Sequence, residues 1–339
     1  MSLFLILIIN VIFLMNFNKF ERLINIYDFP DSKLKLHKRK TPLLGGIIIL
    51  INLSLLIFFQ HSLTNDFLMI ESMFFSMREK LVLIFFLLTF FLIGLYDDKY
   101  KIYPSSRIIL QIFICTIVML IERDLVITKF SLSFYDNKIH LNEFSFFFTL
   151  FCIIIFTNAL NFFDGINGQS CIFYLVIFFY LYFKGDHNYY YLFLIIILFF
   201  VLFLNFKQKL FLGDSGVYLI SAVIIISLIF EHNISRNIYY ADEIFLLLIL
   251  PGLDLVRLTL QRLIKNKNIF VGDREHLHHL LIKKTNLINA NTILFILSVF
   301  PVSALMLGLS FYKVFSLFLI IYFSLFFYLK RNKHQKRKP

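Results

Sequence analysis

The fold class of this chain is decided by residues 81–98, which read LVLIFFLLTFFLIGLYDD. Residues 81–96 carry no charge, and a run of this length approaches the roughly 20 residues that a helix needs to cross a bilayer. The stretch ends in two adjacent aspartates, Asp97 and Asp98, and carboxylates at the ends of membrane helices are costly and rare. It therefore predicts a membrane span that ends in a functional polar site.

Similar apolar runs recur along the whole chain. It has 339 residues, 59% of them hydrophobic, and a mean hydropathy of +0.81, which no ordinary soluble domain reaches. We expect a single all-α integral membrane domain over residues 1–339, with about eleven transmembrane helices. The expected spans are residues 2–17, 43–60, 81–96, 107–121, 144–160, 170–183, 189–205, 215–230, 243–264, 291–309 and 312–329.

The basic residues predict how the chain is oriented. Most of its 33 Lys and Arg residues lie in loops after odd-numbered spans or in the tail 330–339, and cytoplasmic loops carry such an excess. We therefore expect a multi-pass protein of the bacterial inner (cytoplasmic) membrane, with its N-terminus outside and its C-terminus cytoplasmic. The same rule explains the net charge of +12 without nucleic acid, for which no binding motif is present. The expected cytoplasmic active-site loops are residues 18–42, 97–106, 161–169, 205–214 and 265–290.

Three other features carry no predicted chemistry. The first run lacks a basic leader and a small-residue cleavage site, so we expect a retained span and not a signal peptide. Residues 122–143 contain alternating apolar and polar positions, which favours a short hairpin on the outer face. Cys115, Cys152 and Cys171 have no paired spacing, so we expect them to fill space in the core.

The acidic pair Asp97 and Asp98 repels itself unless a cation or a shared proton neutralises it. A hard cation with oxygen ligands is one natural partner, and a role as base is another. Lys101 and Arg107 follow closely, which suits an anionic substrate held together with a metal. The plain alternative is a solvated loop start.

A second polar patch follows the fifth expected span. Asn158, Asn161 and Asp164 are spaced i, i+3 and i+6, so they would share one face of a helix. Gly165 and Gly168 then let the backbone turn and approach a ligand closely. The alternative is hydrogen bonding between helices within the bundle.

A third patch, Gly213-Asp214-Ser215-Gly216, opens the eighth expected span. Asp214 would lie near a helix N-terminus, either as an ordinary cap or as a metal ligand beside bound phosphate. Asn205, at the end of the preceding span, would line the same pocket.

Histidines and a lysine complete the predicted site. His276, His278 and His279 suit either zinc or phosphate, and we favour phosphate because neither cysteine nor a His-Glu-x-x-His motif accompanies them. Lys35 and His37, in the first loop, either meet an anion or serve only as part of the orientation signal.

Taken in order, these patches resemble the motifs of the polyprenyl-phosphate N-acetylhexosamine-1-phosphate transferases of glycosyltransferase family 4. The superfamily also contains the bacterial MurNAc-pentapeptide phosphotransferase. The resemblance covers about residues 20–285 by motif. The matching residues are Asp28, Pro30, Lys35, His37, Pro42, Gly45, Gly46, Asp97, Asp98, Asn158, Asn161, Asp164, Gly165, Gly213, Asp214, Ser215, Gly216, His276, His278 and His279.

Finer details bear on the branch of the superfamily. Residues 251–254 and 273–276 look more like the GlcNAc-1-phosphate branch than the MurNAc-pentapeptide branch. Three residues depart from the family pattern, because Arg107 replaces a usual lysine, Gln169 a common leucine and Val217 a small hydroxyl residue. None of them removes a carboxylate or a histidine, so they concern the choice of sugar and the rate.

The resemblance implies a transfer of N-acetylhexosamine-1-phosphate, most simply GlcNAc-1-phosphate, from a UDP-sugar to polyprenyl (undecaprenyl) phosphate. UMP would leave, and the lipid-linked sugar would start a cell-envelope glycan. The implied cofactor is Mg²⁺, or Mn²⁺ in its place, and the implied assembly is a homodimer among membrane lipids. The implied catalytic residues are Asp97, Asp98, Asp164, His276, His278 and His279. The implied substrate-binding residues are Lys35, His37, Lys101, Arg107, Asn158, Asn161 and Asn205. The implied metal ligands are Asp214, Asn161 and Asp98.

Alternatives come from two directions. Within the enzyme class, the sugar could be MurNAc-pentapeptide. In a different class, a multispan transporter would place charges in mid-span and often show two related halves, whereas mid-span charges are few here and no repeat is visible. A purely structural membrane protein would have no reason to gather acids on one face.

Overall fold

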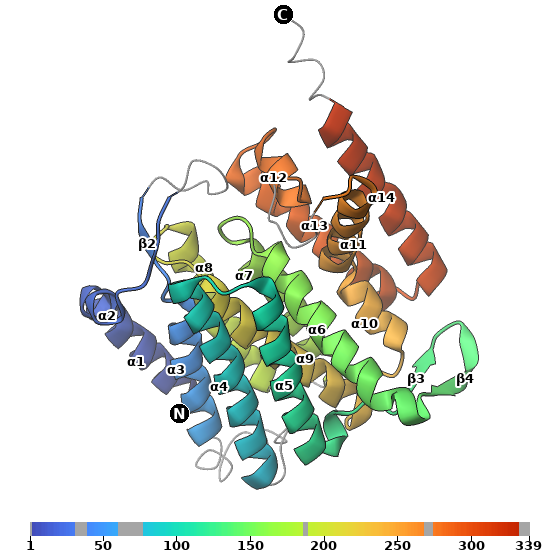
Figure 1. Ribbon diagram of the computed structural model, residues 1–339, viewed down its shortest axis with the longest axis horizontal. Helices are drawn as coiled ribbons and strands as arrows, with labels where there is room; N and C mark the ends of the chain where they lie inside the picture. Colours follow the sequence, from blue (N-terminus) through green and yellow to red (C-terminus); the bar gives the residue numbers. More distant parts are fainter. Residues whose placement is uncertain (1, 31–38, 60–76, 186–188, 268–273, 332–339) are drawn as a thin grey trace, which may run out of the picture.

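The computed structural model describes residues 2–30, 39–59, 77–185, 189–267 and 274–331. Within these ranges the chain is almost entirely helical (Figure 1). The helices are α1 Ser2–Met15, α2 Phe17–Ile24, α3 Gly45–Phe59, α4 Met77–Tyr100, α5 Pro104–Ile121, α6 Ser145–Phe163, α7 Gln169–Lys184, α8 Tyr189–Phe206, α9 Gly213–Asn233, α10 Ala241–Leu247, α11 Ile249–Ile264, α12 Leu277–Ile282, α13 Leu287–Met306 and α14 Phe311–Arg331. The strands are β1 Tyr27–Asp28, β2 Thr41–Pro42, β3 Lys129–Leu132 and β4 Tyr135–His140.

The prediction of an all-α membrane protein is confirmed in its general form. Among the described residues, seven helices are long and apolar enough to cross a membrane. They are α4, α5, α8, α9, α13, α14 and the segment Asn142–Phe163 that contains α6. Two shorter apolar helices cover Gly45–Ile57 and Gln169–Lys184. The count of eleven spans and the orientation of the termini stay predictions.

Each expected span overlaps a helix, but the ninth does not form a single one. Residues 243–264 divide into α10 and α11, with Leu248 between them outside helical geometry at ψ 5°. Pro251 lies in the first turn of α11, where its missing N–H leaves no hydrogen bond unmade. In a continuous helix, the missing N–H of Pro251 would remove one backbone hydrogen bond. The break between α10 and α11 avoids this loss.

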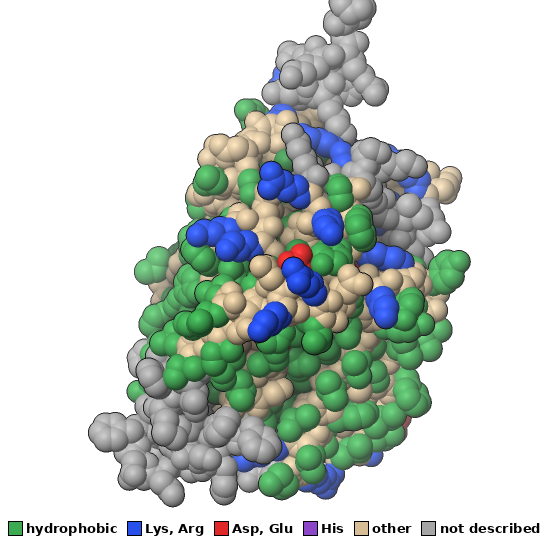
Figure 2. Space-filling view, turned by 90° about the vertical axis from the view of Figure 1, so that its left-hand side faces the viewer, with side chains coloured by type: hydrophobic (Ala, Val, Ile, Leu, Met, Phe, Trp, Pro, Cys, Tyr) green, Lys and Arg blue, Asp and Glu red, His purple; other side chains and the backbone are tan. Residues whose placement is uncertain are grey.

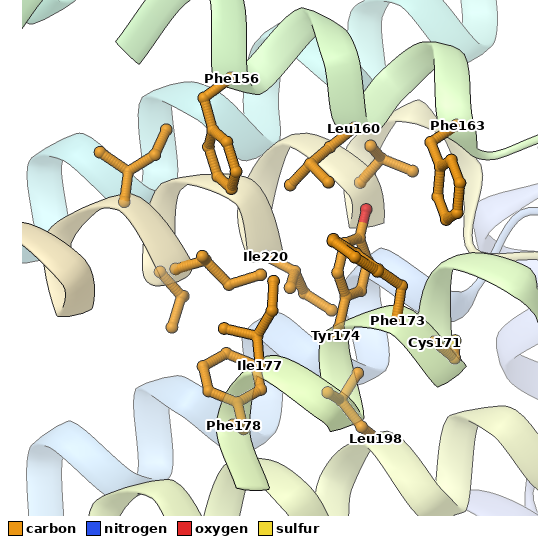
Figure 3. Close-up of a cluster of buried hydrophobic side chains, with 14 of the residues drawn as sticks. Phe156, Leu160, Phe163, Cys171, Phe173, Tyr174, Ile177, Phe178, Leu198 and Ile220 are labelled. Atoms are coloured by element: carbon orange, nitrogen blue, oxygen red, sulfur yellow. The ribbon is translucent and has the colours of Figure 1, made fainter. Parts of the chain in front are cut away.

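Helix α9 is the centre of the bundle. It is apolar on all sides, and 89% of its apolar window is buried inside the protein, chiefly against α4, α3 and α6. Glycines allow the closest approaches, because a Cβ on Gly94 of α4 would lie 2.4 Å from the carbonyl oxygen of Asp214. Figure 3 shows the adjoining core, where Leu160, Tyr174 and Ile220 meet from α6, α7 and α9. This packing fixes the end of α9 that carries Asp214.

The hairpin expected within residues 122–143 is present. Strands β3 and β4 pair antiparallel, and Ser133 at the turn donates its backbone N–H and its hydroxyl to the carboxylate of Asp242. In Figure 1 the hairpin lies at the opposite end of the bundle from β2 and α12. The polar loops described next gather at the β2 and α12 end.

Candidate active site

The end of α4 and the beginning of α9 meet through Asp98. Its two carboxylate oxygens accept the backbone N–H groups of Asp214 and Ser215 at 2.9 and 3.0 Å. Gly213, with φ at +74°, makes the turn before the helix, and a Cβ there would lie 2.7 Å from the Asp98 carboxylate. Asp98 thus caps α9 from another helix, where the helix dipole favours a negative charge.

Asp97 points to a different partner. Its carboxylate accepts from Arg107 at 2.5 Å and from the backbone N–H of Ile102 at 2.9 Å, and it is buried. Arg107 on α5 therefore neutralises Asp97 and ties the loop between α4 and α5. The structure separates the two adjacent acids, one bound to a cation and one to a helix end.

Of the predicted helical face on α6, Asn161 reaches the site and Asn158 does not. Asn161 Nδ2 donates to the carboxylate of Asp214 at 2.7 Å. Asn158 lies one turn deeper and donates to Gln111 of α5 at 3.0 Å and to the carbonyl of Ile154 at 2.8 Å. Asn158 accordingly makes the interhelical hydrogen bond that was the alternative to ligand binding.

Asp164 follows the last residue of α6 and accepts a hydrogen bond from Ser170 Oγ at 2.6 Å. Surrounding protein atoms desolvate its carboxyl, and the Asp214 and Asp28 carboxylates add repulsion, which raises its pKa to about 6 against the effect of Ser170. The residue is still exposed to the neighbouring pocket, so water screens part of this cost. An ionised Asp164 is therefore held where a cation would stabilise it.

We expect Asp164→Asn to stabilise the protein at pH 7 when no divalent metal is present. The folded pKa lies above that of an unfolded aspartate, so ionisation costs folding free energy as the pH rises through about 6. After allowance for exposure, the variant should be more stable by about 1 kcal/mol at pH 7, with no advantage near pH 4. Thermal unfolding in detergent with EDTA across this range measures the difference, and an advantage independent of pH would contradict the account.

A pocket of about 620 Å³ brings the acids together. Its described lining includes four carboxylates, and Lys101 is the one cation among those residues. The carboxylates are those of Asp28, Asp98, Asp164 and Asp214. Such a set of oxygen donors fits a hard divalent cation, because like charges this close need neutralisation.

Asn205 organises the loops that form this pocket. Its side-chain oxygen accepts from the backbone N–H of Gly168 at 2.6 Å, and its Nδ2 donates to the carbonyl of Leu210 at 3.1 Å. The first loop is joined to the same region, because Gly45 N–H donates to the carbonyl of Phe211 at 3.0 Å. Asn205 lines the pocket as predicted and also ties two of its loops together.

The three predicted histidines form a cluster beside the pocket. His276 Nδ1 lies 2.9 Å from the carboxylate of Asp254, and His278 Nδ1 lies 3.3 Å from Nε2 of Gln169. Burial, and then the neighbouring histidines, lower the pKa of His278 well below its usual value, so it is neutral at pH 7. His279 lines the pocket.

Asp254, His276 and His278 also have the composition of a metal site, since their ligand atoms all lie within 4.8 Å of one another. However, the Asp254 carboxylate already accepts from Arg257 at 2.7 Å and from the hydroxyl of Tyr322 at 2.8 Å. A guanidinium at this distance repels a metal ion, so we assign a hydrogen-bonded network to these residues. The contact of the histidines with phosphate stays a prediction.

Two predicted residues, Lys35 and His37, lie outside the described residues. Sequence reasoning left out Asp28 and Asp254 as site residues, although both were noted as parts of motifs. The available signal for Asp254 was a charged pair, Asp254 and Arg257, inside an expected membrane span, where ionisable residues usually mark function.

Comparisons with known proteins agree with the motifs. The family model described as Glycosyl transferase family 4 matches residues 80–231, which contain the aspartates of α4, α6 and α9. The chain is 25% identical over 289 residues to the undecaprenyl-phosphate alpha-N-acetylglucosaminyl 1-phosphate transferase of Escherichia coli (strain K12), covering 82% of this chain and 75% of that protein. The enzyme of the same name from Yersinia pestis is 23% identical over 293 residues, or 83% and 76% of the two chains.

A peptidoglycan enzyme is similar over a shorter range. The phospho-N-acetylmuramoyl-pentapeptide-transferase of Streptococcus pneumoniae serotype 2 (strain D39 / NCTC 7466) is 30% identical over 158 residues, 44% of each chain. The resemblance to the polyprenyl-phosphate N-acetylhexosamine-1-phosphate transferases and their superfamily, predicted from the motifs, is confirmed.

Proposed function

We propose that this protein transfers N-acetylhexosamine-1-phosphate, with GlcNAc as the sugar, from a UDP-sugar to undecaprenyl phosphate and releases UMP. The observation that carries the proposal is the pocket in which Asp28, Asp98, Asp164 and Asp214 converge with Lys101. Three of these acids, Asp98, Asp164 and Asp214, lie at or next to the ends of apolar helices. Carboxylates that can hold a divalent cation, with a cation for phosphate, suit phosphoryl transfer. A setting among membrane helices suits a lipid acceptor.

The residues present fit Mg²⁺. Asp214, Asn161 and Asp98 would hold it, because the Nδ2 of Asn161 is bound to Asp214 and its amide oxygen remains as a donor of the kind Mg²⁺ takes. When bound, the ion offsets negative charge on the pyrophosphate and on the departing UMP.

In the proposed reaction, an oxygen of the lipid phosphate attacks the β-phosphorus of the UDP-sugar. The bond from that phosphorus to the bridging oxygen breaks, and UMP leaves with the electron pair. A phosphate with a second pKa near 6 is mostly dianionic at pH 7, so the attack needs no strong base. Asp97 is already paired with Arg107, which leaves Lys101 and His279 to bind phosphate oxygens in the pocket.

A second cavity suits the lipid tail. It measures about 640 Å³, and its lining of α6, α9, α10 and α11 side chains is almost wholly apolar. Ala159 lines it one turn before Phe163, where α6 ends at the polar pocket. A polyprenyl chain lying in this cavity could present its phosphate to the aspartates without leaving the apolar layer.

The proposed orientation places this pocket at the cytoplasmic side of the bacterial inner membrane. Figure 2 shows most of the visible Lys and Arg side chains around a small acidic patch at one end of the face, with hydrophobic surface below. Such a division suits a headgroup region beside a lipid-facing belt. Fusion of a reporter to the C-terminus would test the orientation.

A turnover assay tests the proposed function. We expect purified protein in detergent to release UMP from UDP-GlcNAc only when undecaprenyl phosphate and Mg²⁺ are both present. UDP-GalNAc and UDP-MurNAc-pentapeptide are the matched donors, and the second tests the peptidoglycan alternative that the shorter similarity keeps open. No UMP from any donor, with folded protein, would overturn the proposal.

A further inference from the structure

Asp254 is a heavily hydrogen-bonded carboxylate outside the acidic pocket. It lies in α11, only 3% exposed, and accepts hydrogen bonds from four groups. These are Arg257 Nη2 at 2.7 Å, Tyr322 Oη at 2.8 Å, His276 Nδ1 at 2.9 Å and Leu277 N at 3.3 Å. Two of the four donors belong to the histidine segment, and one comes from the last helix, α14.

Tyr322 completes the cluster from α14. Its hydroxyl donates to Asp254 and accepts from Arg257 Nε at 3.0 Å, and the residue is fully buried. Arg257 also donates to the carbonyl of Glu275 at 2.9 Å, just before His276. The cluster therefore holds the backbone on both sides of His276 as well as its ring.

The ring of His276 is held in one orientation by the Asp254 carboxylate. An ionised carboxylate only accepts hydrogen bonds, so Nδ1 must carry a proton, and Nε2 is the ring nitrogen that Asp254 does not bind. The ring also stacks on His278 at 5.2 Å and on Phe162 at 6.2 Å between centroids. Phe162 follows Asn161, which binds Asp214, so the stack joins the histidines to the acidic pocket.

We propose that Asp254 and Tyr322 are positioning residues for His276 in the transfer reaction. This inference rests on the proposed function for its kinetic consequences. The two residues keep the Nδ1–H of His276 on Asp254 and hold Nε2 in one place, where a proton on Nε2 lets it donate to a phosphate oxygen. Helix α14 thereby supports the site although it contributes no group to the pocket's described lining.

The test compares Tyr322→Phe with Tyr191→Phe. Both tyrosines are fully buried and both donate to a carboxylate, Tyr191 to Glu231 at 2.5 Å, but Glu231 lies at the other end of α9 from Asp214. We expect Tyr322→Phe to lower kcat about tenfold and Asp254→Asn about a hundredfold, with little change in KM for the UDP-sugar. Tyr191→Phe should change only thermal stability.

A double-mutant cycle tests whether Tyr322 acts through His276. In a His276→Ala background, Tyr322→Phe should cause no further loss, because its effect passes through His276. A full additional loss, or equal kcat losses in the two Tyr→Phe variants, overturns the inference.

Nitrogen-15 spectra of histidine-labelled protein should show His276 protonated at Nδ1 in the wild type and a tautomer mixture in Asp254→Asn. This readout needs no turnover. A wild type that releases no UMP overturns the proposed function, while an unchanged tautomer in Asp254→Asn overturns the positioning role.

Discussion

Asp214→Asn is expected to lower kcat by at least about 10³-fold while leaving the protein folded. The substitution keeps the side-chain oxygen that accepts from Asn161 and the backbone N–H that Asp98 binds, so the local hydrogen bonds survive. What disappears is one of the charges that would hold Mg²⁺ at the start of α9. UMP release over a Mg²⁺ series measures the loss, and excess metal should restore little of it.

Asp242→Asn is the matched control for this prediction. Asp242 is also buried and also binds backbone and hydroxyl donors, but it lies beside the hairpin at the other end of the bundle. We expect it to lose stability and to keep wild-type turnover per folded molecule. An Asp214→Asn enzyme with wild-type kcat would refute the metal assignment.

The helices were largely predictable because apolar runs signal burial whether the neighbour is lipid or protein. For this reason every expected span overlaps a helix, including the central α9, which is surrounded by protein. The same property hid the break between α10 and α11, since Leu248 is as apolar as the residues around it. An apolar pattern indicates which residues are buried from water. It does not indicate whether they form one continuous helix.

Within the site, the sequence spacing showed which residues share a face of a helix. It did not show how far along the helix each residue lies from the other site residues. Asn158 and Asn161 share a face of α6, yet three residues advance the helix by about 4.5 Å. That rise takes Asn158 away from Asp214 and next to Gln111. Asp97 and Asp98 are adjacent in sequence, but consecutive helical residues point about 100° apart. For this reason Asp97 reaches Arg107 and Asp98 reaches the start of α9.

The network around Asp254 depended on tertiary structure. Its partners His276 and Tyr322 are 22 and 68 residues away in sequence, so no local pattern brings them together. The pair Asp254 and Arg257 was visible as charges inside an apolar run. Recognising such a pair as a candidate site is what sequence reasoning could have added.

Gly165→Ala is expected to lower kcat about a hundredfold and to lower the melting temperature as well. A Cβ at this position would lie 1.8 Å from Nε2 of His278, which no packing tolerates. The ring has little freedom to retreat, because it is buried, stacked on His276 at 5.2 Å and packed against His279 at 4.3 Å. The added methyl group must therefore displace the histidine cluster or the turn that carries Asp164.

Two further variants distinguish displacement of the histidines from general damage. In a His278→Ala background, Gly165→Ala should cost little, because the atom it strikes is gone. Gly308→Ala is the opposite case: nothing lies within 4 Å of its Cβ, but its φ of +79° makes any side chain strained. Gly308→Ala should lower the melting temperature and keep kcat, whereas Gly165→Ala should lower kcat as well as the melting temperature. Equal kcat losses from Gly165→Ala with and without His278 would show that the glycine serves the backbone turn and not the ring.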